Sequence, residues 1–260
     1  MIYETLRTEM KGASLVITLH RPHRRNALSV QAMDEIMTAA RCAETDDNVR
    51  SIILTGGPSY FSAGADLTEA IEVKGPSDGV AYFSRFHRLC ETIETLRLPV
   101  IAAIEGFCMT GGLELALACD IRVGGKGSTY AITSARIGTV AGAGGTQRLP
   151  RVVGIPRALE LLFAAEPIDA DEAYRIGLIN RLADKGEAVD AAAAMAKVYE
   201  QRAPLSLAFV KRAVHRGMQM DLASALEFET FLVSAVYSTE DKQEGISAFL
   251  EKRDAKFKGR

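Results

Sequence analysis

Short apolar runs alternate with helix-like patterns from the N-terminus to about residue 200. Four of these runs are rich in Val, Ile and Leu and are bounded by turn residues, which is typical of strands. They cover residues 15–19, 51–55, 98–104 and 119–123. The run at 51–55 is apolar enough to be covered on both faces of a sheet. Strand and helix patterns that alternate at this spacing predict an α/β core with parallel strand pairing.

Apolar residues at the three-to-four spacing predict the helices that separate and follow these strands. The first helix is expected from about Val30 to Ala43, and Ser29 can cap its N-terminus. Further helices are expected at residues 80–96, 112–118, 157–162, 171–176 and 186–202.

The pattern changes at Pro204. Three amphipathic helical patterns then follow one another without a strand between them, at residues 206–217, 222–237 and 241–252. We therefore expect an α/β core over residues 1–203 and a helical region over residues 204–260. A region of this kind covers the core or makes an oligomer contact.

The charge balance of the chain disfavours two classes of binding partner, nucleic acid and anionic lipid. The 260 residues carry 31 basic and 33 acidic side chains, so the formal net charge is −2. A near-neutral chain has little long-range attraction for nucleic acid or anionic lipid, and binding to either is disfavoured. The longest run without charged residues, 51–65, is shorter than the ~20 apolar residues of a membrane span. The N-terminus also lacks the basic start of a targeting segment. We therefore expect a soluble, cytoplasmic protein.

The cysteines and histidines give no sign of a metal centre. Cys42, Cys90, Cys108 and Cys119 show no CxxC spacing, so reduced thiols are expected rather than a disulfide framework or a zinc knuckle. The four histidines have no acid partner at the spacing that a metal site needs.

Two glycine-rich segments are candidates for chemistry. In residues 56–67, small side chains at 62–65 let a ligand approach the backbone closely, just before a helix that can begin at Asp66 and Leu67. In residues 104–119, Gly111 and Gly112 stand at the expected start of a short apolar helix, whose N–H groups can bind negative charge. For the first segment taken alone, an ordinary Gly-rich strand-to-helix turn is the favoured interpretation.

Glu114 is the single ionisable group in that apolar helix. Burial of a carboxyl group raises its pKa, and a raised pKa suits a general acid or base near neutral pH. The alternative is that Glu114 only complements the helix dipole in the first turn.

A third glycine-rich segment, residues 138–145, does not fit a nucleotide-binding motif. Gln147 stands where a GxGxxG fingerprint needs glycine, and no GK[ST] closes a Walker loop. The glycines here indicate tight packing or the floor of a ligand site. Basic clusters around Arg24 and Arg25 and around Lys252 are either solvated surface or contacts to cofactor phosphates.

Taken together, these segments resemble the crotonase, or enoyl-CoA hydratase/isomerase, superfamily. The matching segments are, in order, His20-Arg-Pro with Asn26-Ala-Leu, Phe61-Ser-Ala-Gly-Ala-Asp-Leu, Ile104-Glu-Gly with Gly111-Gly-Leu-Glu-Leu-Ala, Cys119-Asp-Ile, and Gly142-Ala-Gly-Gly-Thr-Gln-Arg-Leu. Residues 238–253 are similar to the family's C-terminal helix. The resemblance implies a spiral core of repeated ββα turns with a helical C-terminal trimerisation region, and a homotrimer or homohexamer.

The resemblance also implies the site. The N–H groups of Ala65 and Gly111 would hold the oxygen of a thioester enolate, and Glu114 would be the acid/base. Ala63 would lie beside the coenzyme A, with its phosphates near Arg24, Arg25 and a Lys252 from a neighbouring subunit. The remaining substrate contacts would be Asp66, Leu67, Gly112 and Gly142. Coenzyme A would enter as part of the thioester, with no separate cofactor bound and no metal.

One position departs from the family's pattern. The second glutamate of the hydratases normally lies four residues before the glycine matched by Gly138, and Ser134 stands there instead. Serine does not transfer a proton near pH 7 without help, although it can hold a water molecule. We expect reversible hydration of a 2-enoyl-CoA to a 3-hydroxyacyl-CoA. The alternatives are enolate chemistry with one carboxylate (double-bond isomerisation or decarboxylation), or an acyl-CoA-binding protein without catalysis.

Overall fold

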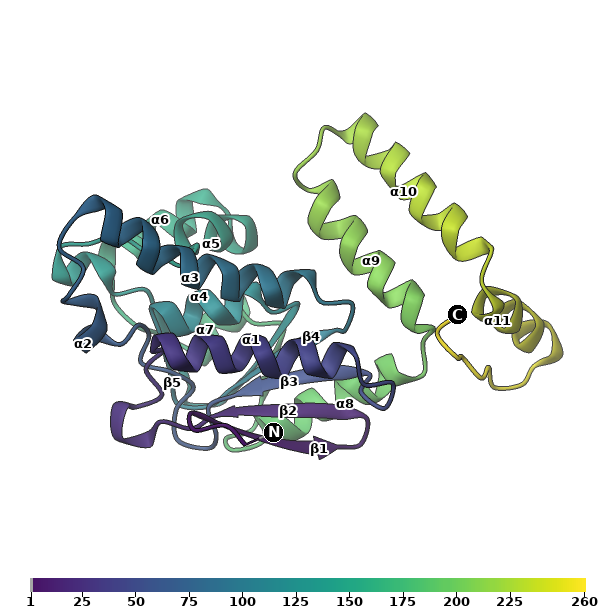
Figure 1. The fold of residues 1–260 in the computed structure, drawn as a ribbon, viewed down its shortest axis with the longest axis horizontal. Coiled ribbons are helices and arrows are strands. Elements are labelled where there is room, and N and C mark those ends of the chain that lie inside the picture. Colours follow the sequence, from purple (N-terminus) through teal and green to yellow (C-terminus); the bar gives the residue numbers. More distant parts are fainter. Residues whose placement is uncertain (1) are drawn as a thin grey trace.

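A six-stranded sheet forms the centre of the molecule (Figure 1), which we describe from a computed structural model that covers residues 2–260. Its strands are β1 (Leu6–Lys11), β2 (Ser14–Leu19), β3 (Ser51–Thr55), β4 (Val100–Ile104), β6 (Ile121–Gly125) and β9 (Arg181–Ala183), in the spatial order β1-β2-β3-β4-β6-β9. β1 pairs with β2 in antiparallel fashion, and all other pairs are parallel. The predicted α/β core with parallel pairing is confirmed.

A second, three-stranded sheet contains β5 (Phe107–Met109), β7 (Thr129–Ala131) and β8 (Ile168–Asp169), in the order β5-β7-β8. From β4 to β7, successive strands alternate between the two sheets: β4 joins the large sheet, β5 joins the small one, and a helix follows. The same order repeats with β6 and β7. These β-β-α units are the turns of the expected spiral.

Helices cover both faces of the large sheet. In β3, Ile52 and Leu54 face one apolar cluster, while Ile53 faces the other. The larger cluster packs under α1 (Val30–Glu44), α3 (Pro76–Thr95) and α4 (Gly111–Ala118). The smaller one packs against α8 (Ala188–Glu200) through three alanines of that helix. The other elements of the core are η1 (Pro22–Arg24), α2 (Leu67–Ala70), η2 (Ser134–Ile137), α5 (Gly145–Val153), α6 (Ile155–Ala164) and α7 (Ala170–Arg175).

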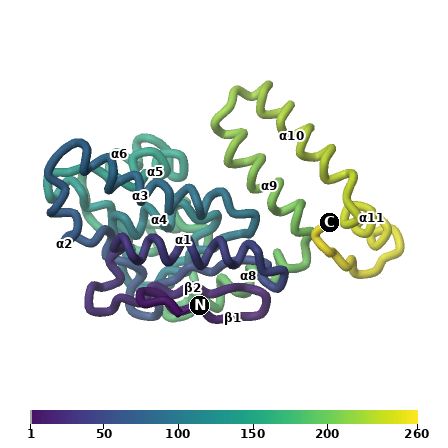
Figure 2. The backbone as a smooth tube through the Cα atoms, in the orientation of Figure 1, coloured from purple at the N-terminus to yellow at the C-terminus, as the bar shows by residue number. Residues whose placement is uncertain are grey.

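The C-terminal helices α9 (Pro204–Gly217), α10 (Leu222–Tyr237) and α11 (Glu240–Glu251) form an arm that protrudes from the core (Figure 2). Lys211 of α9 is a half-buried link between arm and core. Its Nζ donates to the carbonyl oxygens of Ile93 and Leu98 at 3.0 and 3.1 Å, and it lies 2.8 Å from Asp120 Oδ2. Large apolar side chains on the arm are exposed to solvent, among them Phe231 at 67% and Phe249 at 83%.

The sequence-based prediction missed several elements. β1 exposes all its residues except Leu6, so it carries no apolar alternation. β5, β7 and β9 are only three residues long and are too short for a period to show. The segment expected to be a glycine-rich floor continues into α5, an additional helix. The predicted cap is confirmed: Ser29 accepts from the N–H of Ala32. A helix does follow Asp66, whose side chain caps it by accepting from the N–H of Thr68.

Candidate active site

A cavity of about 180 Å³ lies where the loop after β3, helix α3, the N-terminus of α4 and η2 meet. Most of its wall is apolar, and Glu114 is the only acidic residue among those lining it. The lining residues are Ala63, Ala65, Leu67, Ala70, Tyr82, Phe83, Phe86, Thr110, Gly111, Glu114, Thr133, Ser134, Ile137, Thr139, Val140, Gly142 and Ala143. Three of the predicted site residues, Ala65, Gly111 and Glu114, are therefore brought together.

The backbone N–H groups of Ala65 and Gly111 are both available to a ligand. Ala65 forms a parallel bridge with Leu28 in which the neighbours of Ala65 make the hydrogen bonds: Leu28 N–H donates to Gly64 at 2.7 Å and Asp66 N–H donates to Leu28 at 3.1 Å. The N–H of Ala65 consequently points away from Leu28. Gly111 begins α4, where N–H groups have no partner within the helix. Within residues 2–260, neither N–H donates to a protein acceptor.

Gly64 and Gly111 allow these two segments to pack closely, because neither has a Cβ atom. A Cβ on Gly64 would lie 3.1 Å from the nitrogen of Gly111, and a Cβ on Gly111 would lie 3.1 Å from the nitrogen of Ala65. The loop and the helix start therefore approach each other closely enough for both N–H groups to reach one oxygen atom. Preorganised donors of this kind stabilise developing negative charge.

Thr110 precedes Gly111 in a strained backbone conformation, with φ +44° and ψ −113°. Its N–H donates to the carbonyl of Ala131 at 2.7 Å, and its Oγ1 lies 2.9 Å from Oγ1 of Thr133. A β-branched residue avoids positive φ, so these contacts must outweigh the cost of the conformation. They tie the start of α4 to the strand β7 and to the segment before η2.

Glu114 is buried, with 2% of its surface exposed. Its Oε1 accepts two backbone hydrogen bonds of 2.8 Å, from Ala143 and from Gly145. Burial raises the pKa of the carboxyl group, and this effect outweighs the two N–H donors and the positive field of Arg148 and His87, which lower it. Because Oε1 is occupied, Oε2 is the oxygen left for proton transfer.

Ser134 begins η2 and is buried at the edge of the cavity. It also lines a second, apolar cavity of about 430 Å³ between η2 and helices α5 and α6. No carboxylate replaces the missing glutamate, because among residues 2–260 Glu114 alone supplies an acidic side chain to the cavity wall. The structure therefore leaves one acid/base group at this site.

The other predicted contacts divide into two groups. Ala63, Leu67 and Gly142 line the cavity, as expected. Asp66 and Gly112 do not: the Asp66 carboxylate pairs with Arg21 at 2.9 Å, and a Cβ on Gly112 would lie 2.6 Å from Cβ of Ser62. In this structure Asp66 caps α2 and Gly112 lets α4 pack closely, and their contact with substrate stays a prediction.

The basic residues predicted to meet the phosphates lie outside the cavity. Arg24 and Arg25 are exposed on the turn after β2, and the carbonyl of Arg25 accepts from the N–H of Ala63 at 3.0 Å. That bond places the turn beside the cavity entrance. Lys252 ends α11 on the protruding arm and lies far from α4 in the same chain (Figure 1).

Sequence reasoning missed three aromatic residues of α3. Phe86 lines the cavity, and its Cε1 is 3.4 Å from a Cβ position on Gly111. Tyr82 and Phe86 make an edge-to-face contact at 5.5 Å, and Phe83 packs against Gly142. Their spacing places them on neighbouring positions of one helix face, but the same spacing is typical of any buried helix.

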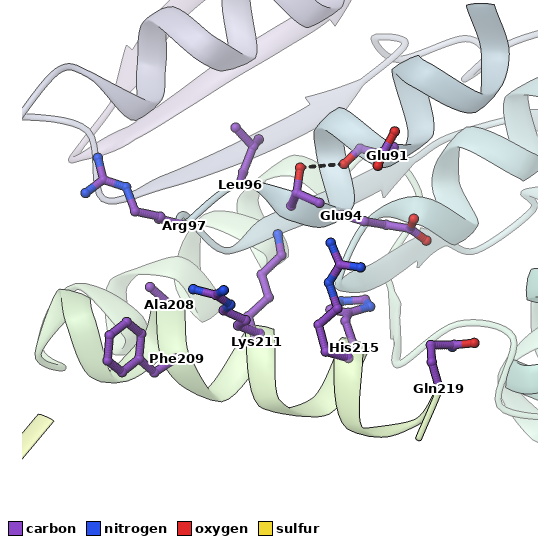
Figure 3. Close-up of a pocket in the computed structure, with 12 residues that line it drawn as sticks. Glu91, Glu94, Leu96, Arg97, Ala208, Phe209, Lys211, His215 and Gln219 are labelled. Carbon is purple, nitrogen blue, oxygen red and sulfur yellow. Dashed lines mark hydrogen bonds between the residues drawn. The ribbon is translucent and has the colours of Figure 1, made fainter. Parts of the chain in front are cut away.

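A further cavity, of about 470 Å³, lies between the C-terminal half of α3 and α9 (Figure 3). Its wall carries Lys211 and His215, which both contact Asp120, together with Arg97, Arg212 and Glu94. Glu94 pairs with Arg148 and Arg97 with Glu44, while the Arg212 guanidinium lies 6.0 Å from the centre of the Phe228 ring. No cluster of metal-ligating side chains is present in residues 2–260. None of the helices in that range has the length and apolar character needed to span a membrane.

Comparison with known proteins gives one consistent family. Residues 9–260 match the family described as enoyl-CoA hydratase/isomerase. A short-chain-enoyl-CoA hydratase of Clostridium acetobutylicum is 39% identical, over 94% of each chain. A mitochondrial methylglutaconyl-CoA hydratase of Mus musculus is 36% identical, over 98% of this chain and 82% of the relative.

The fold agrees with solved structures as well. A crystal structure of an enoyl-CoA hydratase from Bacillus anthracis superposes with a TM-score of 0.93 at 33% identity, covering 99% of this chain and all of the other. The expected spiral fold of ββα turns followed by C-terminal helices is thereby confirmed.

Proposed function

Because the chain belongs to the enoyl-CoA hydratase/isomerase family and is an enzyme of the hydratase type, we propose that the cavity around Glu114 adds water reversibly to a 2-enoyl-CoA. The product is the 3-hydroxyacyl-CoA. The observation that supports this proposal is the closeness of two N–H groups without protein acceptors, those of Ala65 and Gly111, in a cavity that also contains one buried carboxyl group.

In the proposed reaction, the thioester carbonyl oxygen accepts hydrogen bonds from both N–H groups. Oε2 of Glu114 takes a proton from a water molecule while the water oxygen bonds to C3 and electrons shift to the thioester oxygen. The enolate then collapses as Glu114 returns the proton to C2. One water is consumed and the glutamate is regenerated. Each N–H donor contributes roughly 2.7–4 kcal/mol to stabilising the transition state.

Ser134 takes a supporting part in this proposal. Its hydroxyl holds the attacking water by a hydrogen bond and transfers no proton in the reaction. A positioned acid–base group typically contributes about 10²- to 10⁴-fold to the rate. Hydration with one glutamate is therefore expected to be slower than hydration with two.

The coenzyme A is proposed to enter as part of the substrate, with no separate cofactor. Ala63 lines the cavity and is hydrogen-bonded to Arg25, so the pantetheine would lie along this turn, with the phosphates near Arg24 and Arg25. Lys252 would reach the phosphates of a neighbouring copy. The cytoplasmic location remains a prediction from the sequence.

The arm is proposed to be the oligomerisation region, from residue 204 to residue 260, in a homotrimer or homohexamer. Its exposed apolar side chains, Phe231 and Phe249 among them, favour a contact with another copy. The unit before it, residues 1–203, is proposed to be the catalytic core.

The experiment is a spectrophotometric assay with a short 2-enoyl-CoA, in which hydration removes the absorbance of the conjugated thioester. We expect wild-type turnover, a large loss in Glu114→Gln, and a higher rate in Ser134→Glu. An inert wild type combined with an active Ser134→Glu would show that the native reaction is a different one. Equal product from wild type and Glu114→Gln would remove Glu114 from its role.

A second candidate is movement of a double bond from the 3,4 to the 2,3 position of an enoyl-CoA. The presence of a single carboxylate favours it, because one base can remove the proton from C2 and return it at C4. Product analysis after addition of a 3-enoyl-CoA separates the two reactions. A conjugated product without the hydroxyacyl-CoA would favour isomerisation.

A further inference from the structure

A chain of hydrogen bonds connects Glu114 to a residue pair outside the cavity. Glu94, in the last turn of α3, holds Arg148 of α5 with two hydrogen bonds, Nε to Oε1 at 2.5 Å and Nη2 to Oε2 at 2.8 Å. The third guanidinium nitrogen, Nη1, donates to the carbonyl of Ala143 at 3.0 Å. Ala143 and Gly145 in turn donate their N–H groups to Oε1 of Glu114.

The carbonyl group that Arg148 binds belongs to Ala143, whose own N–H is the first donor to Glu114. The second donor is the N–H of Gly145, two residues further along the chain. Fixing this carbonyl therefore fixes the turn that presents both donors to Glu114. Neither Glu94 nor Arg148 lines the cavity, so neither contacts a ligand there.

Gly144 shows how closely the guanidinium packs on this turn. Its φ is +104°, and a Cβ there would lie 1.9 Å from Nη1 of Arg148. Any other residue would displace the guanidinium as well as strain the backbone. The Arg148 N–H also donates to the carbonyl of Gly144, at 2.7 Å. Arg148 thus contacts the turn through its backbone and through its side chain.

We propose that Arg148, oriented by Glu94, is a positioning residue for Glu114. It aligns the N–H groups of Ala143 and Gly145 with Oε1, which directs Oε2 toward the reacting atoms, and its positive charge favours the ionised form of Glu114. This inference rests on the proposed function, in which Glu114 must be ionised to accept a proton from water.

Other groups near Glu114 do not substitute for Arg148. His87 is exposed on α3 and acts on Glu114 only through its charge, whereas the buried Cys90 thiol of the same helix lies 3.6 Å from the carbonyl of Ala143. Burial raises the pKa of Cys90 to about 12, so this thiol stays neutral. Ser134, on the opposite wall, carries no charge. His87 and Arg148 are thus the cationic candidates, and only Arg148 is bonded to the turn.

The test compares kcat and KM as functions of pH in Arg148→Met, Arg148→Lys and Glu94→Gln, with a short 2-enoyl-CoA as substrate. Arg148→Met is expected to lower kcat on the order of 10²-fold, as small misplacements of catalytic groups do, and to move the acid limb of the profile to higher pH. KM should stay within about twofold of wild type, because the residue is outside the cavity.

Arg148→Lys separates charge from geometry. Lysine keeps the positive charge but lacks the planar fork that bonds Glu94 and Ala143 together. We expect its acid limb to stay near that of wild type while kcat falls. Glu94→Gln should resemble a weaker form of Arg148→Met, and the double variant should be no slower than Arg148→Met alone, because Glu94 acts through Arg148.

Arg151→Met is the matched control. Arg151 lies one turn further along α5, is exposed, and donates only to the carbonyl of Gln147, at 2.7 Å. Its profile should equal that of wild type. The proposal would be overturned if the acid limb of Arg148→Met did not move while kcat fell equally at every pH and the melting temperature decreased. Arg148 would then have a purely structural role.

A second readout does not depend on the reaction. The carboxyl carbon of Glu114 is titrated by NMR in protein labelled with ¹³C at the glutamate carboxyl, with Glu114→Gln assigning the signal. The pKa of Glu114 should be higher in Arg148→Met than in wild type. An unchanged titration would refute the proposal. If no enoyl-CoA is turned over, the function fails while this measurement still decides the role of Arg148.

Discussion

The amide nitrogen of Ala65 lies 3.1 Å from the point that a Cβ atom on Gly111 would occupy, and Cε1 of Phe86 lies 3.4 Å from the same point. These distances are tighter than most contacts of real Cβ atoms, so a methyl group here would have to push apart the two segments that supply the N–H donors. The backbone of Gly111 has an ordinary negative φ, so alanine adds no backbone strain there. The cost of the substitution therefore comes from the close contacts at the site.

Gly111→Ala is expected to keep the fold and to lose activity. Displacing one donor of an oxyanion site costs about 10²- to 10³-fold in kcat. Steady-state kinetics and thermal melting of the same preparation check both parts. The matched control is Gly217→Ala in α9, where a Cβ would meet only Ala225 at 3.6 Å. Full activity in Gly111→Ala would argue against a thioester oxygen bound at this place.

Glu114 is expected to reduce stability at neutral pH. In the unfolded chain its pKa is about 4.3, and burial raises it in the fold. Between these two pKa values the folded state binds more protons than the unfolded state. The free energy of unfolding therefore falls as the pH rises through this window, and the loss persists above it.

Glu114→Gln removes this loss, so the variant should be more stable than wild type above the window and equal to it below. Urea unfolding at a series of pH values, from about 4 to 8, measures the difference. A difference that is independent of pH would contradict the assignment of a raised pKa.

Tyr82→Phe is expected to stabilise the protein. Among residues 2–260, Tyr82 Oη is the single buried side-chain polar atom without a hydrogen-bond partner. Burial, aided by the negative charges of Glu69 and Asp66, raises the pKa of Tyr82 to about 12, so the hydroxyl is neutral and still unsatisfied. An unsatisfied buried group costs about 1–3 kcal/mol, and removing it recovers part of that amount.

Tyr130→Phe is the contrasting variant. The Tyr130 hydroxyl is also buried, but it lies 2.8 Å from Oγ of Ser128. Its removal leaves the serine without that partner, and we expect a loss on the order of 1 kcal/mol. Chemical denaturation of both variants gives the two changes. The same sign for both would show that the Tyr82 hydroxyl has a partner in solution.

Phe231→Glu is expected to break the oligomer. The Phe231 side chain is exposed on α10, and burying a charge at an apolar contact between copies is costly. Sedimentation velocity should give a multiple of 28.1 kDa for wild type and a smaller mass for the variant. Glu227→Gln, on the same helix, is the control. A wild-type mass of one chain would reject the proposed role of the arm.

The features predicted well from the sequence are those that the residue types within one short segment determine. The β3 strand, predicted at 51–55, is found at Ser51–Thr55, because every position in it is buried and apolar or small. The cap at Ser29 and the carboxyl group of Glu114 were recognised for the same reason. A polar side chain in an apolar run is visible without knowledge of the fold.

The features that were missed depend on residues far apart in the chain. Glu94 and Arg148 are 54 positions apart, and nothing in either segment indicates that they meet. Tyr82 and Phe86 look like ordinary core residues of a helix until α3 is placed over the start of α4. The sequence likewise does not show that Ser62 occupies the space beside Gly112.

Thr110, with its positive φ, shows that a strained residue can be retained for what its side chain holds. Glycine at this position would relieve the backbone and lose the hydroxyl that fastens the start of α4 to Thr133. Because those contacts outweigh the strain, the exchange would loosen the helix end that carries the N–H of Gly111. The threonine thus gives rigidity at a position where the backbone alone would favour glycine.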